Sequence, residues 1–285
     1  MKRRASIPGR INIIGEHTDY AGGCSLAFAS QHRLVLEAEF VDDGYHGEPT
    51  VVALWKEAGG APAQLQVTSS IPIGKGMSSS AALCLSIVLC VHGASINKQA
   101  ACEEAQRLEH AVLGTPCGLL DQMTMMHSLE GECVLIDFST KTTATMSIPS
   151  EWTFKLVDSG IHRTLNSIDY RTTSTEETKR LHVESENRRV EEAMNSNSQA
   201  LGKLLNETHE SLKTIGVSTP EVDALVTSLQ SEEGVLGARM MGGGFGGMIL
   251  VLVENESVLP DHEIMVPSRP CLLYTSPSPR DYPGS

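Results

Sequence analysis

Charged and hydrogen-bonding side chains gather in a short glycine-containing stretch near the start of the sequence, where Arg10 precedes Glu16, His17 and Asp19. Side chains of these types hydrogen-bond neighbouring hydroxyl groups, so the stretch can hold a polyhydroxylated ligand. A solvated loop is the alternative interpretation, and for an isolated polar run it is the more common one. The sequence has neither the H-E-x-x-H spacing of metalloproteases nor the G-x-S-x-G nucleophile elbow, so hydrolase functions have little support.

Three consecutive serines, Ser78, Ser79 and Ser80, stand between a glycine-rich loop and an apolar segment that predicts a buried helix. Free N–H groups at a helix N-terminus bind anions, and glycine lets a phosphate approach the backbone closely. Simple N-capping by serine explains the same pattern equally well. The P-loop pattern G-x-x-x-x-G-K-[ST] is absent.

A second glycine-rich stretch, residues 242–247, formally contains the pattern G-x-G-x-x-G. A dinucleotide fingerprint follows a strand and opens a helix, whereas these glycines are expected to follow a helix and open a strand. NAD binding is therefore excluded. A tight turn and a backbone that presses against a bound ligand remain as interpretations.

Two further carboxylates, Glu109 and Asp121, flank a Gly/Pro turn at residues 114–118, and each has apolar neighbours in the sequence. A buried carboxylate needs a cationic partner or a metal ion. Two ordinary surface acids are the alternative, and the apolar neighbours make this alternative less favoured than usual. Taken alone, the residues indicate a site for a phosphate and a polyol.

The elements that must position these residues alternate between strand and helix periodicity without a regular β-α-β order, which favours the α+β class. A polar segment at residues 139–150 is the best candidate boundary between two halves. Strands are expected at residues 11–14, 34–38, 65–67, 134–138, 154–157 and 248–253, and helices at 81–91, from Asn97, from about 119, at 176–194, around 201–212 and from Pro220.

The chain has 285 residues and a net charge of −13, which disfavours nucleic acids and anionic membrane surfaces as partners. No apolar stretch approaches the roughly 20 residues that span a bilayer, and no secretory signal is recognisable. Seven cysteines without a C-x-x-C pair suit reduced thiols in the cytoplasm better than a disulfide framework.

Five collinear motifs carry a resemblance to a known family. Residues 8–20, PGRINIIGEHTDY, closely resemble the N-terminal signature of galactokinases, which belong to the GHMP kinase superfamily. Residues 74–82 look like the superfamily's phosphate-binding motif, and residues 109–122 are similar to the stretch that carries its metal and catalytic carboxylates. The match continues through residues 158–160, Tyr170, 208–212 and 237–247.

The resemblance implies a two-domain GHMP-kinase-like architecture with the active site in the cleft between the domains. The N-terminal domain would cover residues 1–148 and the C-terminal domain residues 149–266, and residues 267–285 are expected to form a disordered or non-native tail. The implied reaction is phosphorylation of galactose by ATP at the C1 hydroxyl, with Mg²⁺, in a cytoplasmic monomer. A 1-kinase for arabinose, galacturonic acid or N-acetylgalactosamine, and a binding-only sugar or nucleotide sensor, remain alternatives.

Position by position, the resemblance implies a role for each matched residue. The catalytic residues would be Asp121 and Arg10, and the metal ligands Ser80 and Glu109. The sugar would be bound by Glu16, His17, Asp19, Gly118 and Tyr170. ATP would be bound by Gly74, Gly76, Ser78, Ser79, Ser80, Gly243 and Gly244.

The sequence departs from the family pattern in three places. The segment between the first two motifs is short, and the Trp-, Tyr- and Lys-rich helix expected there is not recognisable, which leaves Trp55 as a weak candidate for the adenine pocket. Thr172 follows Arg171 where the family has a second arginine. Gly243 stands where alanine is usual.

Overall fold

Two β-sheets with helices packed against them make up the protein, and the computed structural model describes residues 1–72, 76–161 and 174–276. In these parts of the chain the first sheet has seven strands and the second has three. The protein mixes helices and strands without a regular β-α-β order, which confirms the predicted α+β class.

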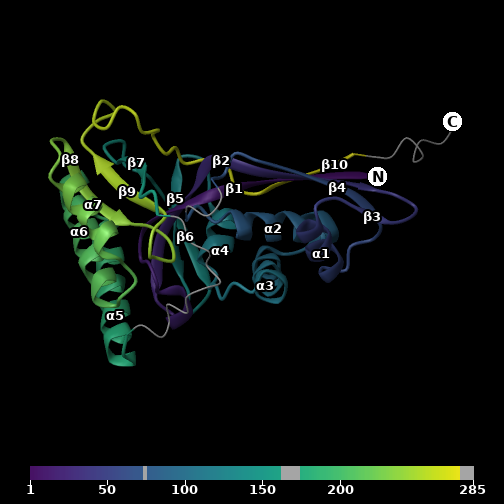
Figure 1. Cartoon of the computed structure of the whole chain (residues 1–285), viewed down its shortest axis with the longest axis horizontal. Helices are drawn as coiled ribbons and strands as arrows, with labels where there is room; N and C mark the ends of the chain where they lie inside the picture. The colour runs from purple at the N-terminus through teal and green to yellow at the C-terminus, as the bar shows by residue number, and fades with distance from the viewer. Residues whose placement is uncertain (73–75, 162–173, 277–285) are drawn as a thin grey trace.

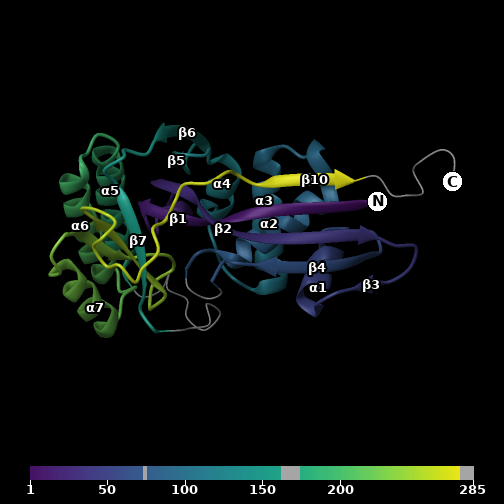
Figure 2. The same cartoon turned by 90° about the horizontal axis from the view of Figure 1, so that it is seen from above.

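The first sheet is built around two long antiparallel strands, β1 (Lys2–Ile14) and β2 (Cys24–Phe40). Arg10 lies in β1, and Glu16, His17 and Asp19 lie in the turn between the two strands. One end of β2 pairs with β4 (Ala63–Ser69) and the other with β5 (Glu132–Asp137), while β1 pairs with an edge strand, β10 (Leu272–Ser276). Figure 2 shows β10 lying alongside β1. The remaining strands are β3 (Tyr45–His46) and β6 (Thr142–Ser147).

Helices of the N-terminal half cover one face of this sheet (Figure 1). The central helix α2 (Ser79–His92) is buried on nearly all sides because its sequence is almost entirely apolar. Asn97 caps α3 (Lys98–Leu108) as predicted, since its Oδ1 accepts a bond from the N–H of Ala100 at 2.8 Å. The other two helices are α1 (Pro49–Glu57) and α4 (Leu120–His127).

The second sheet has the antiparallel order β7-β9-β8, with β7 at Thr153–Asp158, β9 at Met248–Val253 and β8 at Val235–Met240. Its helices α5 (Glu176–Ala193), α6 (Ser198–Thr214) and α7 (Pro220–Gln230) gather at the opposite end of the molecule from α1 (Figure 1). The glycine stretch therefore joins two strands, β8 and β9. The expectation that it follows a helix is wrong, although it still opens no helix.

The proposed division at residues 148/149 falls between β6 and β7, which lie in different sheets. One hydrophobic cluster spans this division, and a second, smaller one lies wholly within the C-terminal half. Phe28 of β2 and Phe154 of β7 are both buried with their ring centroids 5.9 Å apart, and Leu250 of β9 belongs to the same hydrophobic cluster. The shared core holds the two sheets together and so fixes the loops that meet between them.

Three local expectations differ from the structure. The polar segment at 139–150 contains strand β6, which forms a hairpin with β5 and is mostly exposed. Leu272–Ser276, in the expected tail, form β10 at the sheet edge, where the preceding Pro270 need not interrupt a ladder. Helix α1 was not expected, and its Trp55 is fully buried, with Nε1 donating to the Ala61 carbonyl at 2.7 Å.

Helix α6 and strand β8 approach closely through two glycines. A Cβ added at Gly202 would lie 2.2 Å from the carbonyl oxygen of Leu236, and one added at Gly237 would lie 2.2 Å from that of Gly202. A side chain at either position would have to push α6 and β8 apart. Because β8 leads directly into the glycine stretch, this contact helps to place that stretch.

We predict that Gly202→Ala lowers the melting temperature by about 3–10 °C, because overpacking costs about 1–3 kcal/mol. The exposed Lys203 on the same helix provides the control, and Lys203→Ala should leave the melting temperature within about 1 °C. Calorimetry of both variants tests this. Equal melting temperatures for Gly202→Ala and wild type would contradict the tight contact.

Candidate active site

One pocket lies where loops of both halves meet. The turn after β1, the loop before α2, the loop before α4 and the glycine stretch after β8 all contribute to it. Its lining combines carboxylates, serines and glycines with few apolar side chains. The lining residues are Arg10, Glu16, His17, Asp19, Tyr20, Gly76, Ser78, Ser79, Ser80, Glu109, Thr115, Pro116, Cys117, Gly118, Leu120, Asp121, Met241, Gly242, Gly243, Gly246 and Gly247.

Most of the residues singled out from the sequence line this pocket, although they come from four separate stretches of the chain. Gly244 does not line it, because its Cα faces Val217, whose carbonyl oxygen would lie 2.3 Å from an added Cβ. Gly74 and Tyr170 lie outside the described residues. The predicted residues that line the pocket are Arg10, Glu16, His17, Asp19, Gly76, Ser78, Ser79, Ser80, Glu109, Gly118, Asp121 and Gly243.

The candidate catalytic pair is in direct contact. Nε of Arg10 lies 2.7 Å from Oδ1 of Asp121, and the Arg10 side chain is buried while that of Asp121 is partly accessible from the pocket. Nη1 of Arg10 also donates to the carbonyl of Gly76 at 2.6 Å. The guanidinium thus joins the carboxylate to the loop before α2 in a fixed geometry.

The N-terminus of α2 opens into the pocket without a side-chain cap. Ser78 adopts the left-handed conformation with φ 62°, and its side chain makes no capping bond to the helix. Simple capping is therefore not what these serines do, and the N–H groups of the first turn are available to an anion. Gly76, with φ +77°, lets the loop pass close to the glycine stretch, since an added Cβ would lie 3.0 Å from the Met241 carbonyl.

Glu109 stands at the start of a π-helical turn (Glu109–Leu113) and is buried. Its oxygens accept bonds from Ser80 Oγ at 2.5 Å, Gln122 Nε2 at 3.0 Å and Cys117 Sγ at 3.4 Å. These partners are all neutral. Burial, and to a smaller degree the charge of Asp121, raises the pKa of Glu109 to about 7, although the Ser80 hydroxyl lowers it.

A buried carboxylate next to a hydroxyl, with no cation bonded to it, is a fitting donor set for Mg²⁺. The described residues hold no group of three or more His, Cys, Asp or Glu side chains placed to bind a metal ion. Glu109 and Ser80 are the residues of this pocket that could hold such an ion.

Asp19 also lines the pocket, packed against the loop before α4. Its Oδ2 accepts a bond from the N–H of Leu120 at 3.3 Å, and a Cβ added at Gly118 would lie 1.9 Å from the same oxygen. A side chain at position 118 would therefore force the Asp19 carboxylate to move. Burial and the nearby charge of Asp121 raise the pKa of Asp19 to about 6.

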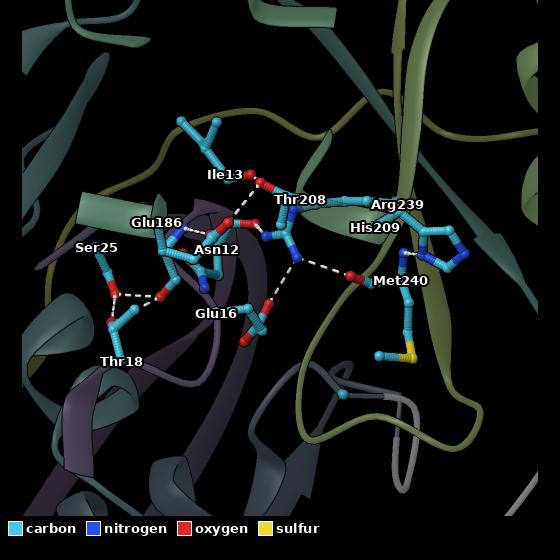
Figure 3. A network of polar contacts seen from close by, with 12 residues as sticks. Asn12, Ile13, Glu16, Thr18, Ser25, Glu186, Thr208, His209, Arg239 and Met240 are labelled. Carbon is cyan, nitrogen blue, oxygen red and sulfur yellow. Dashed lines mark hydrogen bonds and ion pairs between the residues drawn. The ribbon is translucent and has the colours of Figure 1, made fainter. Parts of the chain in front are cut away.

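The carboxylate of Glu16 is held from the other half of the chain (Figure 3). Its Oε2 lies 2.8 Å from Nη1 of Arg239 on β8, and both side chains are buried. Burial alone would raise the pKa of Glu16, but the guanidinium groups of Arg239 and Arg10 outweigh it and hold the pKa below its ordinary value. Glu16 is therefore charged at neutral pH.

Sequence reasoning assigned no role to several residues of the site. Cys117 and Gln122 both bond to Glu109, and their place within the stretch 109–122 was the only signal for them. Arg239 stood in the matched stretch 237–247, but its contact with Glu16 spans 223 positions of sequence. No local pattern indicates such a long-range contact.

Three family models match the chain, and with the fold and pocket they define its class. "GHMP kinases N terminal domain" matches residues 47–128 and "GHMP kinases C terminal" matches residues 190–260. The mevalonate kinase of Methanococcus jannaschii has the same fold, with a TM-score of 0.70 at 18% identity over 90% of this chain and 92% of that one. The protein is thus a GHMP kinase by fold.

A third model, "Galactokinase galactose-binding signature", matches residues 3–39. Galactokinase of Thermotoga maritima is 31% identical over 313 aligned positions, covering 88% of this chain and 89% of that protein, and human galactokinase is 29% identical, covering 88% and 84%. The structure of Lactococcus lactis galactokinase complexed with galactose superposes with a TM-score of 0.83 at 22% identity, covering 95% of each chain. The chain belongs to the galactokinase family.

The described parts of the chain contain no helix with both the length and the apolar character needed to cross a membrane.

We predict that Asp19→Asn stabilises the ligand-free protein at pH 7.5 but not at pH 4. The folded-state pKa of about 6 lies above the ordinary 3.8, so stability falls as pH rises through this interval and stays lower above it. The amide removes that cost, and its oxygen can still accept the Leu120 N–H. The N–H of Tyr20, which bonds to the other carboxylate oxygen at an exposed position, would bond to water instead. Calorimetry should show a melting temperature about 2–4 °C above wild type at pH 7.5. A melting temperature equal to or below wild type there would refute the assignment.

Proposed function

We propose that the protein transfers the γ-phosphoryl group of ATP to the C1 hydroxyl of galactose, giving galactose 1-phosphate and ADP. The observation that carries the proposal is the contact between Arg10 and Asp121, in a pocket that also receives the open N-terminus of α2. Acceptor-side and phosphate-side groups thus face one space, in a chain of the galactokinase family.

Asp121 would receive the proton of the C1 hydroxyl, with Arg10 holding its carboxylate in place through the 2.7 Å contact. A carboxylate is a weak base towards a sugar hydroxyl, so early deprotonation is difficult. The easier role is to align the hydroxyl with the γ-phosphorus and to accept the proton late, as the new P–O bond forms. The transition state of phosphoryl transfer is loose, so positioning and electrostatics supply most of the acceleration.

ATP phosphates would lie against the N-terminus of α2, bound by backbone N–H groups and by Ser78, Ser79 and Ser80. Gly76 and Gly243 would allow the two loops to close on them, and Gly74 keeps its implied role from the resemblance alone. Glu109 and Ser80 would hold Mg²⁺, which neutralises phosphate charge when it is bound. In a chain of net charge −13, this local arrangement must overcome a repulsive overall field.

Galactose would occupy the wall formed by Glu16, His17, Asp19 and Gly118, which all line the pocket near Asp121. Their acceptor oxygens and ring nitrogen suit the hydroxyls of a monosaccharide. Tyr170 is proposed for the same wall from the resemblance alone.

Neither alternative function gains support from a specific observation. A binding-only homologue has no use for the buried arginine that contacts Asp121, and the galactose signature favours galactose over the other sugars.

We place the reaction in the cytoplasm, because all seven cysteines are free thiols. We propose a monomer, since one chain supplies the pocket lining, and no nucleic-acid or membrane partner.

The function is tested by a coupled ADP-release assay on galactose, arabinose, galacturonic acid and N-acetylgalactosamine, with Asp121→Asn as the matched variant. The wild type should prefer galactose. In Asp121→Asn, kcat should fall by about 10²–10⁴, the range of a positioned acid–base group, because the shape is kept and the charge is lost. Nucleotide binding and the melting temperature should be nearly intact. Wild-type turnover by a folded Asp121→Asn protein would remove Asp121 from the mechanism.

The metal assignment predicts a selective loss in Glu109→Gln. Titration calorimetry should show Mg·ATP affinity reduced at least about tenfold, with galactose affinity within about twofold of wild type. The amide also removes a buried charge, so the ligand-free variant should melt no lower than wild type. Equal loss of both ligands would indicate misfolding and would contradict the assignment.

A further inference from the structure

We propose that Arg239 is a positioning residue for the sugar: it fixes the Glu16 carboxylate so that one oxygen is presented to a sugar hydroxyl in a single orientation. This inference rests on the proposed function and deepens it. Arg239 comes from β8, in the half of the chain that does not contain the signature turn, and nothing in the sequence pattern around it indicates a contact with sugar.

The guanidinium of Arg239 is fully buried, and its donors are directed at four separate acceptors (Figure 3). Nε donates to the Ile13 carbonyl at 2.9 Å, and Nη2 donates to the Asn12 carbonyl. Nη1 donates to the Met240 carbonyl at 2.7 Å and to Oε2 of Glu16 at 2.8 Å. A planar fork held at this many points cannot rotate, so the carboxylate that it binds is fixed as well.

The two ends of Glu16 are held by different elements. Its backbone carbonyl accepts a bond from Nε2 of His182 on α5 at 2.8 Å, and Nδ1 of the same ring lies 2.7 Å from Ser211 Oγ on α6. Its side chain is held by β8. Oε2 is engaged by Arg239, and the residue lines the pocket, which leaves Oε1 as the oxygen for a ligand.

The charge balance supports a functional role for this pair. Glu16 pairs with Arg239 while Asp121 pairs with Arg10, so each of these two carboxylates lies beside a buried cation. A hydrogen bond from a sugar hydroxyl to a charged oxygen is stronger than one to a neutral oxygen. Fixing the charged oxygen beforehand also removes the entropy cost of ordering it when the sugar binds.

Lysine cannot replace Arg239, because one ammonium group cannot bond at the same time to the three backbone carbonyls and the Glu16 carboxylate that the guanidinium binds. A contact between Glu16 and the sugar that is equally strong in the ground state and in the transition state affects KM rather than kcat. A merely structural tie between β8 and β1 would instead disturb the adjoining glycine stretch, and it would change the KM for ATP as much as the KM for galactose.

The experiment compares wild type, Arg239→Lys, Glu16→Gln and the double variant by steady-state kinetics and by galactose calorimetry. For Arg239→Lys we expect the KM for galactose to rise about 10- to 100-fold, with kcat within about threefold and the KM for ATP within about twofold. In the Glu16→Gln background, Arg239→Lys should have almost no further effect, because the two residues act as one unit.

Two further variants complete the design. Arg3→Lys is the matched control, since Arg3 also donates to two carbonyls, those of Cys90 and Val91, far from the pocket, and it should leave both KM values unchanged. Glu16→Asp keeps the charge but shortens the side chain, so it cannot reach Arg239 and the sugar together. It should raise the KM for galactose at least tenfold even if Arg239→Lys does not fold.

Each outcome decides the proposal. Wild-type galactose KM in folded Arg239→Lys or in Glu16→Asp would overturn it, as would equal losses for ATP and galactose or full additivity in the double variant. A wild-type protein that neither binds nor phosphorylates galactose would instead refute the proposed function itself.

Discussion

The structure depends on how negative charge is compensated in a single pocket. Glu16, Asp19, Glu109 and Asp121 all line it, and within the described residues the two arginines bonded to this group are Arg10 and Arg239. Glu16 and Asp121 each contact one of these guanidiniums. Asp19 and Glu109 do not, and burial raises their pKa values to about 6 and 7. Without a ligand, ionisation of these two carboxylates therefore lowers the stability of the folded protein.

Asp19 and Glu109, the two carboxylates without an arginine partner, are also groups that would contact ligands. Glu109 would be compensated by a divalent cation and Asp19 by donors of a sugar, so binding would relieve the same unfavourable terms that destabilise the free protein. The arginines have the opposite task. They hold their carboxylates in place before a ligand arrives, which is the preorganisation that phosphoryl transfer requires. A site of this kind gains function by giving up stability.

Much of the fold was predictable, because many of its elements have strong periodicity or clear end signals, such as the all-apolar α2 and the Asn97 cap of α3. Helix α1 was missed although Glu48 accepts from the Val51 N–H and Pro49 occupies the first turn, since the helix is short. Strand β6 was not predicted, because exposed threonines and serines are also typical of a linker. β8 was missed because it is glycine-containing and follows a helix closely, so its Arg239 received no role.

The site itself was predictable as a set of residues but not as a geometry. Motifs that lie within one stretch, such as Glu16 with Asp19, reveal the chemistry through residue type alone. The interactions that orient them come from elsewhere in the chain: Arg239 reaches Glu16 across 223 positions, and His182 reaches the Glu16 carbonyl across 166. Such contacts form only because one shared core fixes the second sheet against the first. The orientation of the Glu16 carboxylate is therefore a property of the assembled halves, and the signature turn alone cannot provide it.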